Sequence, residues 1–570
     1  MSGPGAPGGA GLLVGPGASR WRTFGGRRVL VAAVRTLTST VRLLETLPAL
    51  LRGDRRLDVV YAFDPTSAFN EGVLGALRAA GCRVLPWPQL GSVSPDLIVT
   101  ASENLDLPRG DCPVLVLPHG VGFQKLVPDA RGPGTRVSGM VPDEWLESGR
   151  AWLAVSHPDQ ERQLVAAQPK AAGRTLLVGD PVLDGLSASL SLADSYRAAL
   201  GAGDGRRLVV LSSTWGPASL IGRRPDLPAQ LLAELPYDRY RVALVLHPNV
   251  WSAHGAWHIE TLLADALDAG LLLVPPVHEW RQALVAAHAV VGDHGSVTLY
   301  GAALGKPVLL GAFGDDAVPG TAITALGATA PRLGGRGERG RQIAAAVRDG
   351  QGAARAVAAA AFADEGHALD RLRDALYRLV GLSEPESPAP RARRLPPPAV
   401  AARPVTSWMV ATDLARDGGR RTVAVRRRPA AVFEEWTEPQ DALLHLACDD
   451  READAQLTQS AAVLVRGEPV RAAVEALAWI GDTLRAVPGS RVAAVPLGPR
   501  QFLVGLRDGR VYEVATTGPA LDAGVPAAAV YACLCEGEVE PDGALVALRV
   551  DAGRAQDVSI RLRHGTRPAG

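Results

Sequence analysis

The chain has 570 residues, too many for one hydrophobic core, and a typical ~100–200 residues per domain predicts about three domains. Lys and Arg together number 60 against 59 for Asp and Glu, so no strongly basic surface for nucleic acid is indicated. Hydrophobic residues make up 47% of the chain, which argues against general disorder. We therefore expect several globular domains and no nucleic-acid partner.

The sequence points to a cytoplasmic protein. No stretch offers the roughly 20 uninterrupted apolar residues of a membrane-spanning helix. The five cysteines are odd in number and scattered, which is typical of a reducing compartment and not of a disulfide framework. Residues 1–26 are rich in Gly, Pro and Ala and lack a signal-peptide core, so they predict a disordered leader. Peripheral contact with the inner face of the membrane is left open.

From Arg28 onward, short apolar runs alternate with helical patterns, which is typical of an α/β parallel sheet covered by helices on both faces. The loops after the first two strands contain no G-x-G-x-x-G, which disfavours a dinucleotide dehydrogenase. The strand at Val114 ends in His119 and Gly120, and doubly wound sheets bind ligands at this edge. An imidazole exchanges protons near neutrality, so His119 is a candidate general base.

A glycine-rich break at residues 201–205 predicts the join to a second unit of the same kind. The ends of its strands carry polar side chains again, and a long helical region from Arg341 to Val380 closes it. Because both units direct these loops to a carboxyl edge, we expect a cleft with His119 on one wall. The opposite wall is predicted to carry Ser212, Ser213, Thr214, His247 and Asp293.

The stretch from Val290 to Leu310 joins two apolar strands through a short helix start that contains glycine. Asp293, His294 and Gly295 form the predicted loop, and Ser296 is predicted to cap a helix that ends before Lys306. A helix N-terminus behind a strand offers free N–H groups and a positive dipole end to phosphate. A plain helix cap and a ligand site both fit the spacing, and the position opposite His119 favours the ligand site.

Six of the 11 histidines fall between His247 and His294, so a metal site has to be considered. His254 and His258 have the i, i+4 spacing that holds a metal on a helix. The adjacent Glu of a zinc protease and a third ligand are both missing, so we interpret this stretch as a solvated loop. No metal and no cofactor is predicted.

Residues 382–404 mix prolines and charges without periodicity, which predicts an extended linker. Residues 405–570 then predict an α+β accessory domain with antiparallel strands and a helix near Val470 to Leu484. Cys533-Leu534-Cys535 is interpreted as a strand with one thiol on each face. This part contains no catalytic constellation, and its expected role is binding or packing.

The two-domain layout resembles the GT-B glycosyltransferase fold, which has two Rossmann-like domains facing a cleft. The motifs resemble those of the CDP-glycerol glycerophosphotransferase family of teichoic-acid-type polymerases, over about Val114 to Leu310. The segment from His119 to Leu126 is similar to the family's H-G-T-P-L-K-K-L. Four further segments are similar to its P-T-W-R, R-L-H-P, D-Y-S-S and L-x-K-P motifs, in that order: Thr214-Trp215, Leu246-His247-Pro248, Asp293-His294-Gly295-Ser296 and Leu304-Gly305-Lys306-Pro307.

The resemblance implies that residues 27–200 form an N-terminal Rossmann-like domain. It implies that residues 206–381 form a nucleotide-binding Rossmann-like domain with a return helix. It implies a transferase that moves a glycerol-phosphate, polyol-phosphate or sugar group from a nucleotide-activated donor to a hydroxyl of a polymer or glycolipid, in cell-envelope polymer synthesis. His119 and His247 are the implied catalytic residues, with Gly120, Lys125 and Asp180 on the acceptor side. The implied donor contacts are Ser212, Ser213, Thr214, Asp293, His294, Gly295, Ser296 and Lys306.

The same residues also resemble UDP-N-acetylglucosamine 2-epimerase, whose T-G-N-T-V-I-D is similar to the segment from Val178 to Asp184. Tyr300 and Gly301 stand where GT-B proteins carry a carboxylate, which in many of them binds the donor ribose. An Arg is also missing beside Thr214-Trp215. Two alternatives therefore stay open: a nucleotide-sugar epimerase, and a degenerate GT-B module that binds without catalysis.

Overall fold

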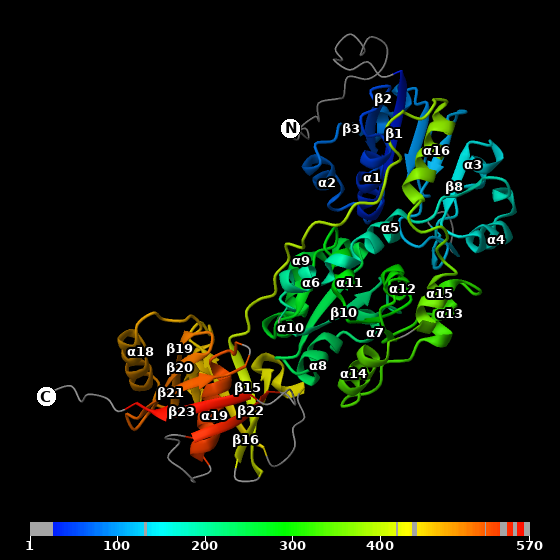
Figure 1. Cartoon of the computed structure of the whole chain (residues 1–570). Helices are drawn as coiled ribbons and strands as arrows, with labels where there is room; N and C mark the ends of the chain where they lie inside the picture. Colours follow the sequence, from blue (N-terminus) through cyan, green and yellow to red (C-terminus); the bar gives the residue numbers. More distant parts are fainter. Residues whose placement is uncertain are drawn as a thin grey trace, which may run out of the picture.

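The protein folds into two Rossmann-like α/β domains that face a cleft, followed by a C-terminal α+β domain built on a closed barrel (Figure 1). This computed structural model describes residues 27–129, 134–203, 205–350, 352–417, 420–435, 442–518, 520–535, 544–550 and 556–563. The fold class expected from the sequence is confirmed. The predicted leader, residues 1–26, lies outside the described residues.

The first sheet has seven parallel strands in the order β3-β2-β1-β4-β5-β8-β9. Its central strands are covered on both faces, which explains their nearly continuous apolar runs. The strands are β1 (Arg28–Val34), β2 (Leu57–Phe63), β3 (Val84–Pro86), β4 (Leu97–Thr100), β5 (Val114–Val116), β8 (Ala151–Val155) and β9 (Thr175–Leu177). The helices of this part are α1 (Leu37–Leu50), α2 (Val73–Ala79), α3 (Asp143–Glu147) and α4 (Pro158–Ala167), and a small hairpin pairs β6 (Leu126–Pro128) with β7 (Thr135–Val137). The next two helices, α5 (Pro181–Ala188) and α6 (Ala193–Ala199), pack into the core of the second sheet.

The second sheet has five parallel strands in the order β12-β11-β10-β13-β14. The strand order reverses between β10 and β13, and this switch point is where open α/β sheets form a ligand crevice. The strands are β10 (Arg207–Ser213), β11 (Tyr240–Leu246), β12 (Leu272–Val274), β13 (Ala289–Gly292) and β14 (Val308–Leu310). The helices are α7 (Leu220–Arg223), α8 (Leu227–Glu234), α9 (Pro248–Leu262), α10 (Ala264–Asp268), α11 (Trp280–Ala286), α12 (Ser296–Ala303) and α13 (Ala322–Thr329).

The helical region predicted from Arg341 to Val380, which closes the second sheet, consists of three helices. They are α14 (Arg339–Asp349), α15 (Gly352–Ala358) and α16 (Ala368–Val380). Gly350, the C-cap residue of α14, has a positive φ angle, a backbone state that glycine adopts without a steric penalty and that ends the helix. Gly366, also at a positive φ angle, lies in the loop before α16. α16 returns to the first domain, where Leu372 and Leu376 join the core under β1 and β4.

The segment at residues 382–404 is extended, as the sequence indicates, but it is tied down along its length. The Tyr196 hydroxyl donates to the carbonyl of Leu395, whose own N–H donates to Ser189 Oγ. The Gln282 amide donates to the Pro396 carbonyl, and Arg403 forms an ion pair with Asp268 at 3.0 Å. This segment therefore runs as a strap along the second domain (Figure 1).

Nine strands form the closed barrel, and the expectation of antiparallel strands holds for only part of it. β16 pairs with β22, and β18 with both β17 and β19, in parallel. The order around the barrel is β15-β16-β22-β23-β21-β20-β19-β18-β17. The strands are β15 (Ser407–Asp417), β16 (Arg420–Pro429), β17 (Leu443–Asp449), β18 (Val463–Val465), β19 (Val492–Gly498), β20 (Gln501–Leu506), β21 (Val511–Thr516), β22 (Ala544–Val550) and β23 (Gln556–Leu562).

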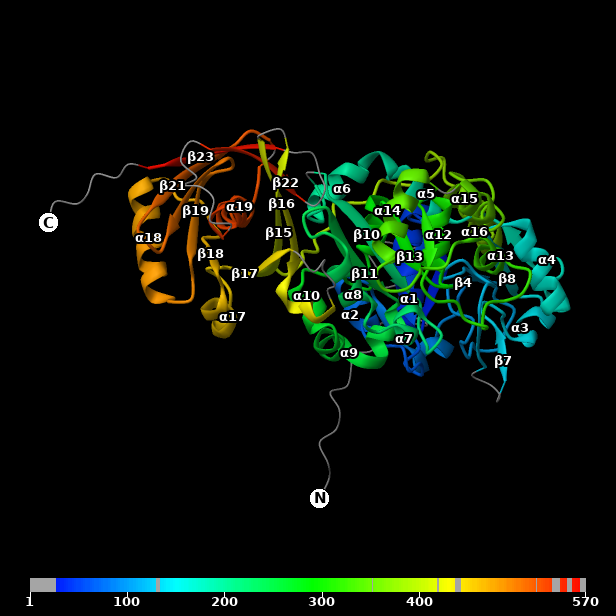
Figure 2. The same cartoon turned by 90° about the horizontal axis from the view of Figure 1, so that it is seen from below.

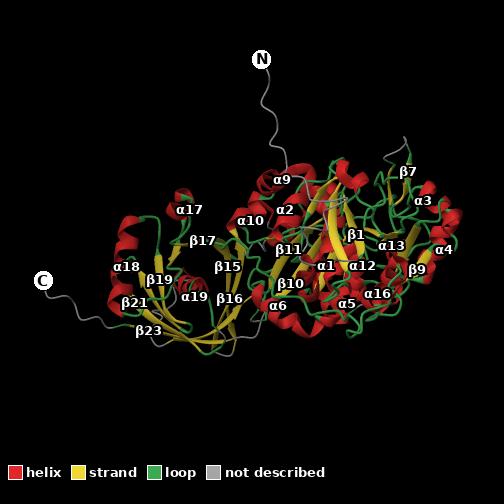
Figure 3. Cartoon of the chain, turned by 90° about the horizontal axis from the view of Figure 1, so that it is seen from above, coloured by secondary structure: helices red, strands yellow, loops and turns green. Residues whose placement is uncertain are grey.

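The barrel encloses a helix, α19 (Gly524–Cys535), around which the strands curve (Figures 2 and 3). Residues 524–533 are all buried, so the helix is apolar on every side. The interpretation of Cys533-Leu534-Cys535 as a strand is wrong, because a helix buried all round gives the same unbroken apolar run as a buried strand. Two further helices, α17 (Ala455–Ser460) and α18 (Ala473–Ala486), belong to this domain; the second of them is the one predicted near Val470.

Arg427 joins the barrel to the second Rossmann-like domain. Its side chain is 1% exposed and forms ion pairs of 2.6 Å with Asp238 and with Asp522. The guanidinium also lies over the rings of Tyr237 and Trp408. Burial alone would lower the pKa of Arg427, but the two carboxylates raise it well above its ordinary value. The Arg427 guanidinium therefore stays protonated, and each of the two domains supplies one carboxylate that balances its charge.

We expect the barrel to lose stability in acid through His445, a buried residue of β17 beside Tyr531. Neither ring nitrogen has a hydrogen-bond partner within the described ranges, and burial lowers the pKa from 6.5 to about 4. As the pH falls, the unfolded chain therefore binds the proton first. Between pH 6.5 and 4, the free energy of unfolding therefore decreases by an amount on the order of 3 kcal/mol.

Chemical denaturation of the His445→Phe protein at several pH values measures this contribution. The variant is expected to have a smaller decrease of unfolding free energy below pH 6.5 than the parent. His258→Phe, a substitution at an exposed histidine, is the matched control and is expected to keep the parent's pH dependence. Identical pH dependence in His445→Phe and the parent would contradict the assignment.

Candidate functional site

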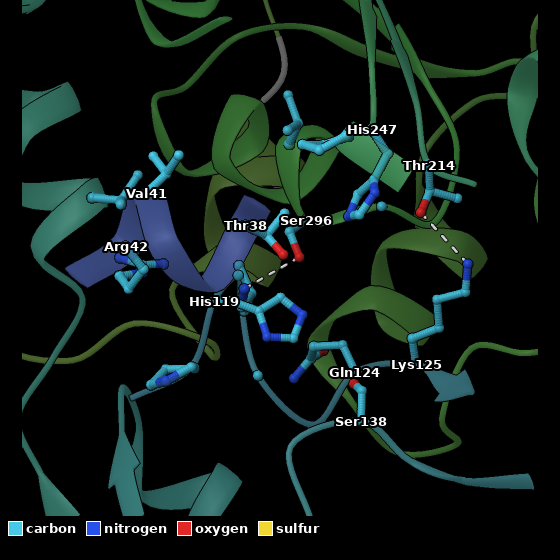
Figure 4. A pocket seen from close by; sticks show the side chains of 18 of the residues that line it. Thr38, Val41, Arg42, His119, Gln124, Lys125, Ser138, Thr214, His247 and Ser296 are labelled. Atoms are coloured by element: carbon cyan, nitrogen blue, oxygen red, sulfur yellow. Dashed lines mark hydrogen bonds between the residues drawn. The ribbon is translucent and has the colours of Figure 1, made fainter. Parts of the chain in front are cut away.

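A cavity of about 200 Å³ lies between the two Rossmann-like domains (Figure 4). Its first wall is formed by α1, Glu103 and the segment from Val116 to Lys125, and its second wall by the loops after β10, β11, β12 and β13. It therefore sits at the carboxyl ends of both sheets, where the sequence placed the cleft. The predicted site residues that line it are His119, Gly120, Lys125, Ser212, Ser213, Thr214, His247, His294, Gly295 and Ser296.

His119 is exposed to the cavity near the start of the loop that follows β5 (Figure 4). Its Nδ1 lies 3.2 Å from the carbonyl oxygen of Ala101. A carbonyl only accepts hydrogen bonds, so Nδ1 carries the proton and Nε2 keeps its lone pair. This tautomer leaves His119 able to accept a proton from a bound hydroxyl group.

His247 caps the N-terminus of α9 on the opposite wall. Its Nδ1 accepts the N–H of Asn249 at 3.1 Å, which leaves the proton on Nε2. Burial lowers the pKa of His247 to about 3, and the nearby His119 and Lys125 act in the same direction. His247 is therefore neutral at physiological pH, and its Nε2–H can donate one hydrogen bond to an anionic oxygen.

Asp293 is fully buried and does not line the cavity, although the sequence assigned it to the donor. Its Oδ2 accepts the N–H groups of Thr214 and Leu220 at 2.9 and 2.8 Å, and its Oδ1 accepts that of Gly295 at 2.9 Å. Burial raises the pKa of this carboxyl despite those donors. Asp293 therefore fixes the spacing of the loops after β10 and β13.

The prediction that Ser296 caps α12 is wrong. Gly295 is the N-cap residue, without a side-chain cap, and Ser296 is the first residue of the helix. Its Oγ instead accepts the N–H of Val121 across the cleft at 3.2 Å. The first N–H groups of a helix have no intrahelical partner, so Ser296 and Val297 present theirs at the cavity wall.

Lys125 belongs to the first wall, but its side chain reaches the second wall at the loop after β10; the resemblance implied a place on the acceptor side. Its Nζ is 3.1 Å from the Trp215 carbonyl oxygen and 3.5 Å from Thr214 Oγ1, and it lies 4.8 Å from the centre of the Trp215 ring (Figure 4). The first domain thus supplies a positive charge beside Thr214-Trp215, where the sequence has no Arg. No sequence pattern could have found this contact, because 89 residues separate Lys125 from Thr214.

Asp180 and Lys306 also lie outside the cavity lining. Asp180 caps α5, and its Oδ2 accepts the hydroxyl of Tyr300 at 2.7 Å. The Lys306 ammonium donates to the Val285 carbonyl at 2.7 Å, and burial lowers its pKa to about 8. Both side chains are thus occupied by contacts within the protein.

Three charged residues of the cavity wall were missed by sequence reasoning: Arg42, Glu45 and Glu103. Arg42 is buried on α1, 3.8 Å from Asp180, and its only signal is a charge on the apolar face of a helix. Glu103 Oε1 accepts hydrogen bonds from Arg136 and from the N–H of Gly139. Burial alone would raise the pKa of Glu103, but His119 and Arg136 hold it below its usual value.

His254 and His258 lie on α9, so the interpretation of this stretch as a loop is wrong. Both side chains are exposed, with their ring centres 6.0 Å apart, on a helix kinked at Gly255. In the part of the chain that the structure describes, no cluster of three His, Cys, Asp or Glu side chains could hold a metal ion.

Across the described ranges, no helix combines the length and apolar character needed to cross a membrane.

Known proteins resemble the chain in fold only. No protein-family model and no curated protein sequence matches it. The wall teichoic acid polymerase TagF is 12% identical, with a TM-score of 0.41 over 62% of this chain and 89% of that chain. The S. aureus MnaA-UDP co-structure is 11% identical, with a TM-score of 0.39 over 63% of this chain and 99% of that one.

The UDP-GlcNAc 2-epimerase from Neisseria meningitidis bound to UDP-GlcNAc is 13% identical, with a TM-score of 0.39 over 62% of this chain and 100% of that one. Both groups of proteins that the motifs resemble are thus found among the similar structures. Likenesses with TM-scores this low bear on no activity, so function has to be argued from the site itself.

Gly120→Ala is expected to destabilise the protein by about 1–3 kcal/mol, because the added Cβ meets Ser296 Oγ at 2.8 Å. Removing that oxygen with Ser296→Ala should restore part of the loss in the double variant. Thermal or chemical denaturation measures both effects. Gly75→Ala, with open space around its Cβ, is the matched control; a similar effect of the two alanines, or no rescue, would contradict the close approach.

Proposed function

We propose that the chain is a GT-B-type transferase that moves a glycerol-phosphate, polyol-phosphate or sugar group from a nucleotide-activated donor to a hydroxyl of a polymer or glycolipid acceptor. One observation carries this proposal: His119 and His247, from opposite domains, line one cavity together with the N-terminus of α12. The tautomers of the two histidines are complementary, since one offers a lone pair and the other an N–H.

In the proposed reaction, His119 Nε2 takes the proton of the acceptor hydroxyl as its oxygen attacks the donor. The bond between the transferred group and the nucleotide breaks, and its electron pair stays on the leaving phosphate oxygen. The Nε2–H of His247 and the first N–H groups of α12 are the donors available to stabilise that charge, and the Lys125 ammonium adds a positive charge beside them. These groups are fixed by their own hydrogen bonds, so little reorganisation is needed during the reaction.

Glu103 favours a second candidate, a nucleotide-sugar epimerase. Its carboxylate lies on the same wall as His119, which helps to hold the pKa of Glu103 below its usual value. A carboxylate and an imidazole together can remove a proton from a sugar carbon and return one to its other face. A product assay separates the two activities, because an epimerase converts its sugar nucleotide without an acceptor, whereas a transferase releases CMP, CDP or UDP when acceptor is present.

We expect the full chain to bind a nucleotide-activated donor. Calorimetric titration with CDP-glycerol, CTP, UDP-N-acetylglucosamine and UDP tests this, and heat of binding with at least one of them supports the proposal. If none binds at millimolar concentration, both enzyme candidates are wrong, and a degenerate module for another ligand remains.

His119→Ala is expected to lower turnover at least about 100-fold, because it removes the proton acceptor. The side chain is exposed, so the melting temperature and donor affinity should change little. His258→Ala, at an exposed histidine of α9, is the matched control and should keep turnover. An unfolded His119→Ala protein would mean that the residue is structural, and unchanged turnover would remove it from the reaction.

A further inference from the structure

The ammonium group of Lys125 is fully engaged by the protein. An ammonium has three N–H donors, and three oxygen acceptors surround this one. Two are neutral, the Trp215 carbonyl at 3.1 Å and Thr214 Oγ1 at 3.5 Å. The third is the Asp316 carboxylate, with Oδ2 at 3.2 Å. An incoming anion can therefore reach Lys125 only by replacing one of these oxygens.

Asp316 has a second partner that belongs to its own domain. Its Oδ1 lies 2.8 Å from Nε2 of His294, whose side chain is 0% exposed. His294 Nδ1 accepts the N–H of Gly314, so its proton is on Nε2, the ring nitrogen nearest to Asp316. The carboxylate is thus shared between a fixed imidazole and a lysine that comes from the other domain.

The surroundings of Asp316 keep it charged and leave it accessible. Burial alone would raise the pKa of its carboxyl, but His294 and Lys125 lower it to about 2. Its side chain remains 32% exposed, whereas the His294 ring is closed to solvent. A Cβ at Gly314 would overlap Asp316 Oδ1 and come within 2.8 Å of His294 Cε1, so the arrangement depends on this glycine.

We propose that Asp316 is the resident counter-anion of Lys125 and that a phosphate group of the ligand replaces it. This inference rests on the proposed function, since it requires an anionic ligand in the cavity. On binding, Lys125 exchanges a carboxylate oxygen for a phosphate oxygen, and Asp316 keeps its 2.8 Å contact with His294 Nε2. Asp316 is then a selectivity residue, because a neutral ligand group is a weaker partner for the ammonium than the carboxylate it would replace, whereas a phosphate oxygen keeps the negative charge.

Hydrogen bonds of the backbone on both sides of Lys125 hold the two domains together, so only side chains need to move when the phosphate replaces Asp316. The N–H of Leu126 donates to the Asp316 carbonyl at 2.7 Å, and that of Val318 donates to the Gln124 carbonyl at 3.0 Å. The Ile323 N–H also donates to Gln124 Oε1. These bonds join the two domains on either side of Lys125, so the exchange does not require them to separate.

Calorimetric titration of the full chain with inorganic pyrophosphate tests the inference directly. Asp316→Asn keeps the shape of the side chain and removes its charge, so it should tighten pyrophosphate binding at least about threefold. The gain should vanish in the Asp316→Asn/Lys125→Met double variant when it is compared with Lys125→Met alone. Asp315→Asn, at the neighbouring exposed carboxylate, is the matched control and should bind as the parent does.

Unchanged or weaker binding by Asp316→Asn overturns the inference, and so does an equal gain in the Lys125→Met background. Absence of pyrophosphate binding to every variant also overturns it. The proposed function fails separately. If pyrophosphate follows the expected pattern while no nucleotide donor binds, the ion-pair exchange stands and the transferase does not. If a donor is bound and turned over while Asp316→Asn changes nothing, only the exchange is wrong.

Discussion

The candidate site depends on the buried carboxylate of Asp293. Three backbone N–H groups from three separate segments point at its two oxygens, and they set the positions of the β10 loop, the start of α7 and the start of α12. The loops after β10 and β13 lie at the switch point of the second sheet, where the connections from two neighbouring parallel strands run to opposite sides and leave a crevice. The Asp293 carboxylate therefore holds the loop with Thr214 at a fixed distance from the start of α12, where Ser296 lies.

The first domain completes the cavity through a segment that crosses to the second. Val121, Gln124 and Lys125 each contact the other domain, through Ser296, the 318–323 region and the Thr214 loop. Phe123 within this segment has a φ of 64°, a conformation that side chains rarely adopt and that surrounding contacts must hold in place. The position of His119 therefore follows from interdomain contacts as much as from its own strand.

The sequence is sufficient to predict what depends on local pattern. Buried parallel strands produce apolar runs, and polar residues at their carboxyl ends meet at one edge, so His119 and His247 could be placed on facing walls. Contacts between distant segments leave no such pattern. Nothing in the sequence indicates that Lys125 reaches Thr214, that Asp316 pairs with it, or that Glu103 lines the cavity. Local periodicity also fails for α19, because a helix buried on all sides lacks a polar face.

At Tyr300, one residue of a motif differs from the expected one and has a different role in the structure. It stands where the resemblance led us to expect a carboxylate, and its hydroxyl is committed to Asp180 in the other domain, with Arg42 beside that carboxylate. Its ring stacks with Phe362 and lies near Trp280. A position that would hold a ligand's ribose is thus used to join the two domains.

The helix enclosed by the barrel restricts the order in which the chain can fold. Seven of the barrel strands precede α19 in the sequence, while β22 and β23 follow it and close the ring through β16 and β21. During synthesis the two α/β sheets can form as soon as their own strands emerge, since domains generally fold as units. The barrel cannot close until residue 562 has left the ribosome, so its apolar strands remain unpaired for longer than those of the two α/β sheets. They are therefore the part of the nascent chain that most needs protection from aggregation.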